Sequence, residues 1–198
     1  MLSRGDFSRF VRNGCQLGFA WVPKKGSQML VFQFGSNTSS SRLNSRDRLN
    51  GDAKDLGLAV TAERFDLDFA VWSKTNNCAA ADLRSDGEQN VWGVLYQVPD
   101  HLMSAATSGA RRSFDAIEGP NYERRPILVR RADGNPIEDP VVTYTVRHPK
   151  PRLLTSFEYV SHILCGLREH NAPIAYVQYV KTRIVANNGA LADAISDL

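Results

Sequence analysis

The sequence predicts an α+β fold, with strands gathered in the middle of the chain and helices near its end. Short apolar or alternating segments, which are typical of strands, recur between residues 29 and 147. The clearest stripe of apolar residues at helical spacing falls later, within residues 156–170. Strands and helices do not alternate regularly along the chain, which argues against a doubly wound parallel sheet.

Length and composition indicate one globular domain with a substantial core. The chain has 198 residues, and 42% of them are hydrophobic. Its net charge of +3 is small for this length, so we expect no nucleic-acid partner, which would require basic residues gathered on one face. Residues 1–28 fit the rest of the pattern least well. We therefore predict an N-terminal extension at 1–28 and a domain at 29–198.

Cysteine spacing and the N-terminus bear on location. Cys15, Cys78 and Cys165 are odd in number and widely spaced, which favours neither a zinc site nor a disulfide framework and fits a reducing compartment. Charged residues such as Arg4 and Asp6 precede any apolar run, so the start of the chain is a poor secretory signal. No apolar run approaches the ~20 residues of a membrane span. These features predict a cytoplasmic protein without a membrane partner.

Four segments before residue 100 carry the first structural predictions. Met29–Phe34 is short, apolar and followed by glycine, so it reads as a buried strand. Thr38–Asn50 is polar, and we expect a loop that passes into a helical turn. Arg64–Trp72 alternates apolar and polar side chains, which predicts a strand with one buried face. Val91–Val98 is predicted to be another strand.

The middle of the chain supplies further predicted strands and one predicted helix. Cys78–Leu83 is a candidate strand, with turn residues at Ser85–Asn90. Leu102–Ile117 is compatible with a helix, although it contains a glycine that weakens the prediction. Arg125–Arg131 and Val141–Arg147 are predicted to be paired strands. The sequence Asp-Gly-Asn-Pro at 133–136 lies in their connection and is a strong turn signal.

Ser156–His170 is the best helix prediction, and it rests on a stripe of apolar residues. These are Phe157, Val160, Ile163, Leu164 and Leu167. Asn171 and Pro173 end this helix, and a second short helix is expected after the proline. The tail Asn187–Leu198 is small and polar, and we expect it to fray.

Glu118 is the most informative single residue. It lies in the segment S-F-D-A-I-E-G-P-N-Y-E-R-R-P-I-L-V at 113–129, and a Gly-Ser-Asn turn follows the apolar strand about eighty residues earlier. Together these stretches suggest a carboxylate opposite a loop of backbone N–H donors. That pairing suits proton transfer at an amide or ester carbonyl.

Several short motifs follow one another in a fixed order between Met29 and Val180. They are Phe34-Gly35-Ser36-Asn37-Thr38, Arg42, Phe65–Trp72, Val91–Tyr96, Asp115–Gly119, Tyr122–Arg125, Thr143-Tyr144 and Gly166–Pro173. In this order they resemble the gamma-glutamylcyclotransferases and their AIG2-like relatives. Two positions depart from the family pattern, because Phe34 replaces a tyrosine and Thr38 replaces a leucine. Residues before Met29 have no counterpart in that pattern.

The resemblance implies a small mixed β-barrel flanked by helices. It also implies a reaction in which the α-amine of a small gamma-glutamyl compound attacks its own γ-carbonyl, releasing 5-oxoproline and an amine. Glu118 corresponds to the family's general acid and base, and no metal or other cofactor is needed because the nucleophile is tethered to the substrate. The loop Phe34, Gly35, Ser36, Asn37 and Thr38 would cradle the substrate, with Tyr122 and Tyr144 lining the pocket.

Plainer interpretations stand beside these. Glu118 alone is typical of a helix-terminal surface glutamate before a glycine, and Gly35-Ser36-Asn37 alone is typical of a strand-ending turn. Tyr122 and Tyr144 are equally compatible with core packing. A non-catalytic member that binds a small metabolite or a protein through the same pocket is the main rival, since fold alone does not decide function. A different gamma-glutamyl acceptor is also compatible with the changes at Phe34 and Thr38.

Overall fold

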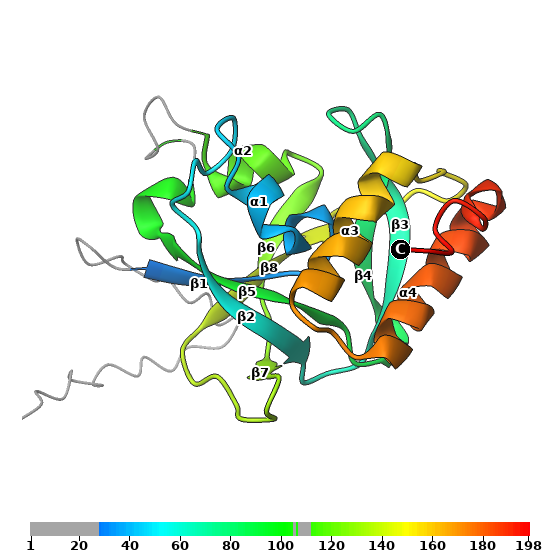
Figure 1. Ribbon diagram of the computed structural model, residues 1–198. Coiled ribbons are helices and arrows are strands. Elements are labelled where there is room, and N and C mark those ends of the chain that lie inside the picture. Colours follow the sequence, from blue (N-terminus) through cyan, green and yellow to red (C-terminus); the bar gives the residue numbers. More distant parts are fainter. Residues whose placement is uncertain (1–27, 105, 107–111) are drawn as a thin grey trace, which may run out of the picture.

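The computed structural model describes residues 28–104, 106 and 112–198 (Figure 1). The described chain is α+β, as predicted, and its largest element is a six-stranded mixed sheet. Across the sheet its strands are β6 (Tyr122–Pro126), β8 (Val141–Val146), β1 (Gln28–Gln33), β5 (Trp92–Pro99), β2 (Lys54–Thr61) and β7 (Val129–Arg131). The predicted extension at 1–28 lies almost wholly outside the described residues and stays a prediction.

The sheet is built around β1. This strand runs antiparallel to β5 on one side and parallel to β8 on the other, so a crossover brings the late strand β8 beside the first. The strand order ends at β6 on one side and at β7 on the other. The barrel that the resemblance implied is therefore present as an open, mixed sheet with helices against it.

A separate two-stranded sheet pairs β3 (Phe65–Ser73) with β4 (Cys78–Gln89). The turn predicted at Ser85–Asn90 is wrong, because β4 continues to Gln89. Gly87 permits this continuation: a Cβ there would lie 1.9 Å from the backbone of Phe65, so only glycine allows so close an approach. The pairing register shifts at the same place, between Phe65 and Asp66.

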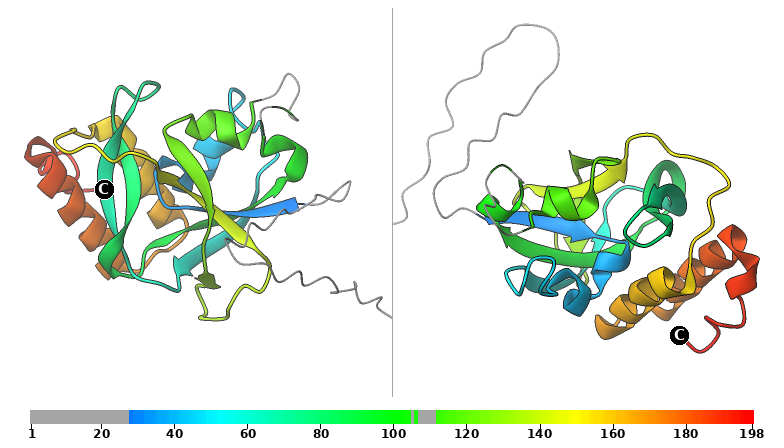
Figure 2. Two further views of the ribbon diagram at one scale, coloured as in Figure 1. Left: turned by 180° about the vertical axis from the view of Figure 1, so that it is seen from behind. Right: turned by 90° about the horizontal axis from the view of Figure 1, so that it is seen from above.

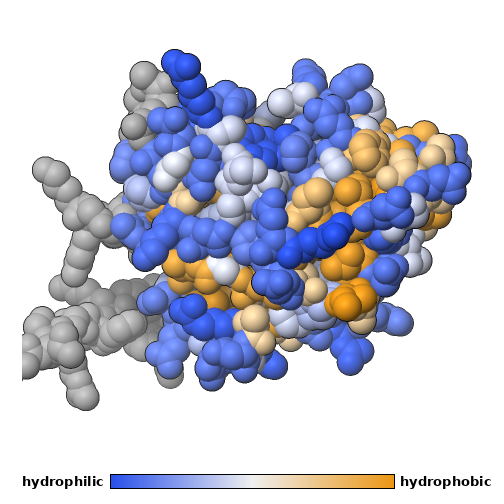
Figure 3. Space-filling view, in the orientation of Figure 1, coloured by the Kyte–Doolittle hydropathy of each residue, from blue (hydrophilic) through white to orange (hydrophobic). Residues whose placement is uncertain are grey.

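Two long helices cover this sheet (Figures 1 and 2). α3 (Phe157–Glu169) begins after Ser156, whose side chain accepts a hydrogen bond from the Tyr159 amide, and α4 (Ile174–Asn187) follows Pro173. The predicted apolar stripe is right except at its first member. Phe157 is 44% exposed, and Tyr159 is buried in its place. Figure 3 shows hydrophobic side chains gathered over the α3 and α4 region of an otherwise largely hydrophilic face.

Short helices occupy the connections. They are η1 (Ser36–Thr38), α1 (Ser40–Leu43), η2 (Asp100–Leu102), α2 (Phe114–Glu118) and η3 (Gly189–Leu191). The single helix predicted over Leu102–Ile117 is therefore wrong in its middle: Leu102 ends η2 and Phe114–Ile117 lies in α2, but the described residues between them are not helical. The prediction that the tail frays is wrong, because the tail contains the short helix η3 and Ile195 is only 1% exposed.

The strand predictions were wrong where the pairing partner in the sheet, rather than the local sequence, sets the strand boundaries. β2 was not predicted, since its sequence K-D-L-G-L-A-V-T has no clean alternation. Arg125–Arg131 was predicted as one strand, but it splits into β6, which pairs with β8, and β7, which pairs with β2. The break falls at Ile127 and Leu128, between the two strands. The predicted turn at 133–136 is confirmed, with the Gly134 amide donating to the Arg131 carbonyl at 2.9 Å.

The core lies on both faces of the six-stranded sheet, as the two-residue repeat of a strand requires. On β1, Leu30 and Phe32 face the core that contains α3 and α4, whereas Val31 faces a second core with α1 and α2. Cys78 and Cys165 are free thiols. None of the helices in the described residues is long and apolar enough to cross a membrane. Within the same residues no His, Cys, Asp and Glu side chains cluster in a way that would hold a metal ion.

Candidate active site

α2 carries Glu118 at its last position and is fixed at both ends. The Ser113 side chain caps the start of the helix by accepting a hydrogen bond from the Ala116 amide at 3.2 Å. Phe114 is fully buried, and its ring stacks on that of Tyr144 with centroids 5.3 Å apart. The helix is only one turn long, so these two contacts, rather than its own hydrogen bonds, hold Glu118 in place.

The loop after β1 faces Glu118 and is held from several sides. The Thr38 amide donates to the Gly35 carbonyl at 3.0 Å, which closes the η1 turn. The hydroxyl of Tyr96, a residue of β5, donates to the Asn37 carbonyl at 3.0 Å. On the helical side Gly166 of α3 packs directly against the loop, where a Cβ would lie 2.4 Å from the carbonyl carbon of Thr38. The position of the loop is therefore set by both the sheet and α3.

A small cavity of ≈ 30 Å³ lies between the loop and α2. Its walls come from β1, η1, β4, α2, β6, β8 and α3. The lining residues are Gln33, Phe34, Gly35, Ser36, Asn37, Ala81, Glu118, Tyr122, Tyr144 and Tyr159. Segments that are far apart in the sequence thus meet at one point of the fold.

Glu118 accepts a hydrogen bond from the side chain of the loop asparagine. Asn37 Nδ2 donates to Glu118 Oε1 at 2.9 Å and also to Gln33 Oε1 at 3.1 Å. The amide oxygen of Asn37 accepts from Arg48 Nη1 at 2.5 Å. The carboxylate is therefore the end of a chain of side-chain donors that begins at an arginine.

Burial raises the pKa of Glu118 to about 7, from an ordinary value of 4.5. The residue is only partly exposed, and the loss of water around its carboxylate outweighs the influences that lower the pKa. These are the positive charge of Arg48 and the hydrogen-bonding side chains of Asn37 and Gln33, all of which lower the pKa. The charge of Asp115 raises it slightly further. A carboxyl group with this pKa can both accept and release a proton near neutral pH.

Three tyrosines enclose the cavity, and each hydroxyl has a partner. The Tyr122 hydroxyl donates to the Ala81 carbonyl at 2.7 Å, and the Tyr159 hydroxyl accepts from the Ala81 amide at 3.0 Å. The Tyr144 hydroxyl donates to Asp115 Oδ1 at 2.6 Å. Burial raises the pKa of all three phenols, so they are neutral at physiological pH.

Solved structures of three other proteins share this arrangement of elements. A protein described as gamma-glutamyl cyclotransferase aligns with a TM-score of 0.65 at 21% identity, over 78% of this chain and 87% of its own. An uncharacterized protein from Homo sapiens aligns with a TM-score of 0.65 at 22% identity, over 78% of this chain and 86% of its own. YkqA from Bacillus subtilis aligns with a TM-score of 0.63 at 18% identity, over 81% of this chain and 55% of its own. The chain has the gamma-glutamyl cyclotransferase-like fold. No family model and no curated protein matches the sequence itself.

Within this gamma-glutamyl cyclotransferase-like fold, most of the residues singled out from the sequence lie together. Those that line the cavity are Phe34, Gly35, Ser36, Asn37, Glu118, Tyr122 and Tyr144. Thr38 does not line it. Its side chain is fully buried against α3, where the hydroxyl donates to the Ile163 carbonyl at 3.3 Å. The position occupied by leucine in the family motif thus packs against the helix in this chain.

Sequence reasoning missed four residues at the same site: Gln33, Arg48, Ala81 and Tyr159. Gln33 gave a signal, because it is the one polar side chain in the apolar run of the first strand and is only 5% exposed. Tyr159 gave a weaker one, since it lies one residue away from the predicted helical stripe. Arg48 and Ala81 gave none, because their approach to the cavity depends on the packing of loops and of a second sheet.

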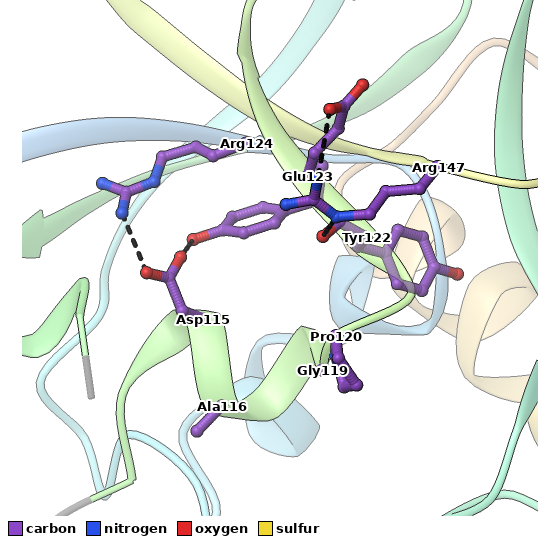
Figure 4. A pocket seen from close by; sticks show the side chains of 9 residues that line it. Asp115, Ala116, Gly119, Pro120, Tyr122, Glu123, Arg124 and Arg147 are labelled. Carbon is purple, nitrogen blue, oxygen red and sulfur yellow. Dashed lines mark hydrogen bonds and ion pairs between the residues drawn. The ribbon is translucent and has the colours of Figure 1, made fainter. Parts of the chain in front are cut away.

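A larger hollow of ≈ 630 Å³ adjoins the small cavity beside Glu118 and shares Tyr122 and Tyr144 with it (Figure 4). It lies between α2 and β6. Arg124 forms an ion pair with Asp115 at 2.9 Å, and Arg147 forms one with Glu123 at 3.5 Å. The small cavity therefore lies next to a wide, polar recess.

Proposed function

We propose that the protein catalyses gamma-glutamyl cyclotransfer on a small gamma-glutamyl compound. In this reaction the substrate's α-nitrogen attacks its own γ-carbonyl carbon, a five-membered ring closes, and the bond from that carbon to the departing nitrogen breaks. The products are 5-oxoproline and a free amine or amino acid. The α-nitrogen loses two protons overall and the departing nitrogen gains two, so the catalyst ends in its starting state.

Glu118 is the proposed general acid and base. It takes a proton from the α-ammonium group, which frees the nitrogen lone pair for attack, and returns one to the departing amine. The single observation that carries this role is the position of Glu118. Its carboxylate borders the cavity formed with the loop, in surroundings that raise its pKa to about 7. A carboxyl group with an ordinary pKa would be too weak a base for this task.

The loop at Gly35–Asn37 is the proposed cradle for the substrate's carboxylate or for the oxyanion that develops at the γ-carbon. These three residues line the same cavity as Glu118, which supports this role because backbone N–H groups stabilise developing negative charge. Phe34, Tyr122 and Tyr144 are proposed to shape the pocket. Thr38 is proposed to act only through the loop, since its side chain faces α3.

The volume of the cavity favours one second candidate, a binding module without catalysis. A cavity of ≈ 30 Å³ holds about one water molecule, so a gamma-glutamyl group enters only if the surrounding side chains or the loop move. A non-catalytic module that binds a metabolite in the adjoining hollow of ≈ 630 Å³, which shares Tyr122 and Tyr144 with the cavity, would need no such opening.

A substrate panel tests the proposed function against the binding module. The protein is incubated with gamma-glutamyl dipeptides, gamma-glutamyl amines and glutathione, and 5-oxoproline is measured. We expect release from at least one of these compounds, at a rate that depends on Glu118. Absence of 5-oxoproline from the whole panel, together with binding of a panel member in calorimetry, would establish the binding module instead.

A further inference from the structure

Arg48 is a partly buried arginine whose side-chain hydrogen bond goes to an amide. Its Nη1 donates to Asn37 Oδ1 at 2.5 Å, and within the described residues no carboxylate lies at ion-pair distance from it. Burial is the main cause that lowers the pKa of Arg48, and the charge of Arg42 adds to it. An arginine held in such surroundings without a paired carboxylate loses hydration that one neutral hydrogen bond only partly replaces. Its position therefore calls for an explanation beyond stability.

The bond from Arg48 determines which way the Asn37 amide faces. Arginine has only donors, so it must contact the amide oxygen. The amide nitrogen then points the other way, where it reaches Glu118 Oε1 at 2.9 Å and Gln33 Oε1 at 3.1 Å. If the amide were reversed, its oxygen would face the Glu118 carboxylate, and two acceptors would repel each other.

We propose that Arg48 is a positioning residue for Glu118, which it acts on through Asn37. It holds the Asn37 amide with its NH₂ group toward the carboxylate, and so fixes the orientation of Glu118 toward the cavity. This inference rests on the role of Glu118 in the proposed function. Its structural part, the arginine–amide–carboxylate chain, is measurable without any substrate.

The same arrangement supplies charge as well as orientation. The groups that face Glu118 are the positive Arg48, the negative Asp115, and the neutral phenols Tyr122, Tyr144 and Tyr159. Of these two charged groups, Arg48 lowers the pKa of Glu118 and Asp115 raises it. The further charges near Arg48 are those of Arg42, Asp47 and Arg112. Removal of Arg48 therefore removes the main stabilisation of ionised Glu118 by a neighbouring charge.

The test uses the full chain and two readouts of the free protein. The first is the titration of the Glu118 carboxyl carbon by NMR, assigned with Glu118→Gln. The second is hydrogen exchange of the Asn37 side-chain NH₂ group. Arg48→Gln is expected to raise the apparent pKa of Glu118 by on the order of one unit, because an opposite charge nearby favours the ionised form. It is also expected to accelerate exchange at Asn37. Arg48→Lys, which keeps the charge, is expected to restore most of the titration.

Arg46→Gln is the matched control, because Arg46 is in the same segment, is exposed, and loses the same charge. It is expected to leave both readouts at wild-type values. If Arg48→Gln does not fold, the Asn37 exchange rates of Arg48→Lys and Arg46→Lys are compared instead. Exchange is expected to be faster in Arg48→Lys, because a single flexible ammonium donor holds the Asn37 amide less firmly than a guanidinium group does. Wild-type titration and exchange in the folded Arg48 variants would overturn the proposal.

Turnover separates this inference from the proposed function. If the wild type releases 5-oxoproline, Arg48→Gln is expected to shift the acidic limb of its kcat/KM profile upward together with the Glu118 titration. If the wild type releases no 5-oxoproline while Arg48→Gln still shifts the Glu118 titration, the arginine–amide–carboxylate chain stands and the proposed reaction fails. A moved titration with an unmoved acidic limb would overturn the role of Arg48 in catalysis.

Discussion

Glu118 and Asp82 are two carboxylates with similar surroundings and different roles in the fold. Burial raises the pKa of both, to about 7 for Glu118 and about 6 for Asp82. They differ in what donates to them. Asp82 Oδ1 accepts from the backbone amides of Leu83 at 2.8 Å and Val146 at 2.9 Å, which ties β4 to β8 and so joins the two sheets. Glu118 accepts instead from a side-chain amide that other side chains orient.

The comparison shows that a raised pKa alone does not distinguish a catalytic carboxylate from a structural one. A neighbouring hollow does not distinguish them either, because Asp82 borders one of ≈ 660 Å³. The discriminating feature is the kind of donor. Backbone amides hold Asp82 with two short, fixed bonds, which suits a structural role. Glu118 is held by the side-chain amide of Asn37, which Arg48 orients, and it borders the cavity, which suits proton transfer there.

The largest expected effect comes from neutralising each carboxylate. Glu118→Gln keeps the size of the side chain but removes the base, so turnover should fall at least ~100-fold with little change in Tm. Asp82→Asn should leave turnover within ~3-fold of wild type. Initial rates of 5-oxoproline release and thermal melts of both variants check this. Equal losses of turnover in the two variants would remove the distinction between them.

A substitution in the loop should affect binding more than folding. A Cβ at Gly35 would lie 3.2 Å from the Tyr159 hydroxyl and 3.3 Å from Ala81 Cβ, so Gly35→Val fills the cavity. We expect KM to rise by ~10-fold or more in a protein that still folds. Gly166→Ala, by contrast, places a Cβ 2.4 Å from the Thr38 backbone and should destabilise the protein by roughly 1–3 kcal/mol. Michaelis constants and denaturant melts separate the two effects, and a normal KM for Gly35→Val would reduce the loop to a turn.

The pH dependence of stability should be similar for the two carboxylates. A carboxyl group whose folded pKa is raised binds its proton more tightly in the folded state. Its stabilising contribution is therefore complete below pH ~4 and is lost as pH rises through the folded pKa. For Asp82 the shift from 3.8 to about 6 corresponds to roughly 3 kcal/mol. Asp82→Asn should therefore gain stability relative to wild type between pH 4 and 8, as measured by urea melts. A constant difference across that range would contradict the raised pKa.

The pH dependence of catalysis should belong to Glu118 alone. The acidic limb of kcat/KM should have an apparent pKa of about 7, because the base must be ionised in the free enzyme. Asp82→Asn should leave this limb in place. A limb near pH 4.5, or one that moves in Asp82→Asn, would point to a different base.

Smaller effects are expected at the two positions that depart from the family motif. Phe34 lines the cavity, so Phe34→Tyr should change the preference among gamma-glutamyl substrates by a few-fold without abolishing turnover. Thr38→Leu should act on stability, because Thr38 is fully buried and its hydroxyl donates to the Ile163 carbonyl. A loss of about 1 kcal/mol is typical of one such hydrogen bond. Ratios of kcat/KM across the panel, measured beside melts, distinguish the two positions. An unchanged preference for Phe34→Tyr would mean that this ring does not contact the substrate.

The comparison also explains how far the sequence could reach. Glu118 and the loop were recognisable because short motifs set their backbone, and the helix at 156–170 because its apolar stripe and its end signals agree. Asp82 was not recognisable as a link between sheets, since its partner Val146 is sixty-four residues away. β2 and the break between β6 and β7 were missed for the same reason. Their boundaries depend on which strands pair, and local propensity carries little of that information.

The most direct test of the account is single-turnover release of 5-oxoproline, measured side by side for wild type, Glu118→Gln and Asp82→Asn with the best substrate of the panel. The account predicts wild-type rates within ~3-fold for Asp82→Asn and a rate at least ~100-fold lower for folded Glu118→Gln. Retained single-turnover activity in folded Glu118→Gln would contradict the assignment of Glu118 as the group that moves the proton.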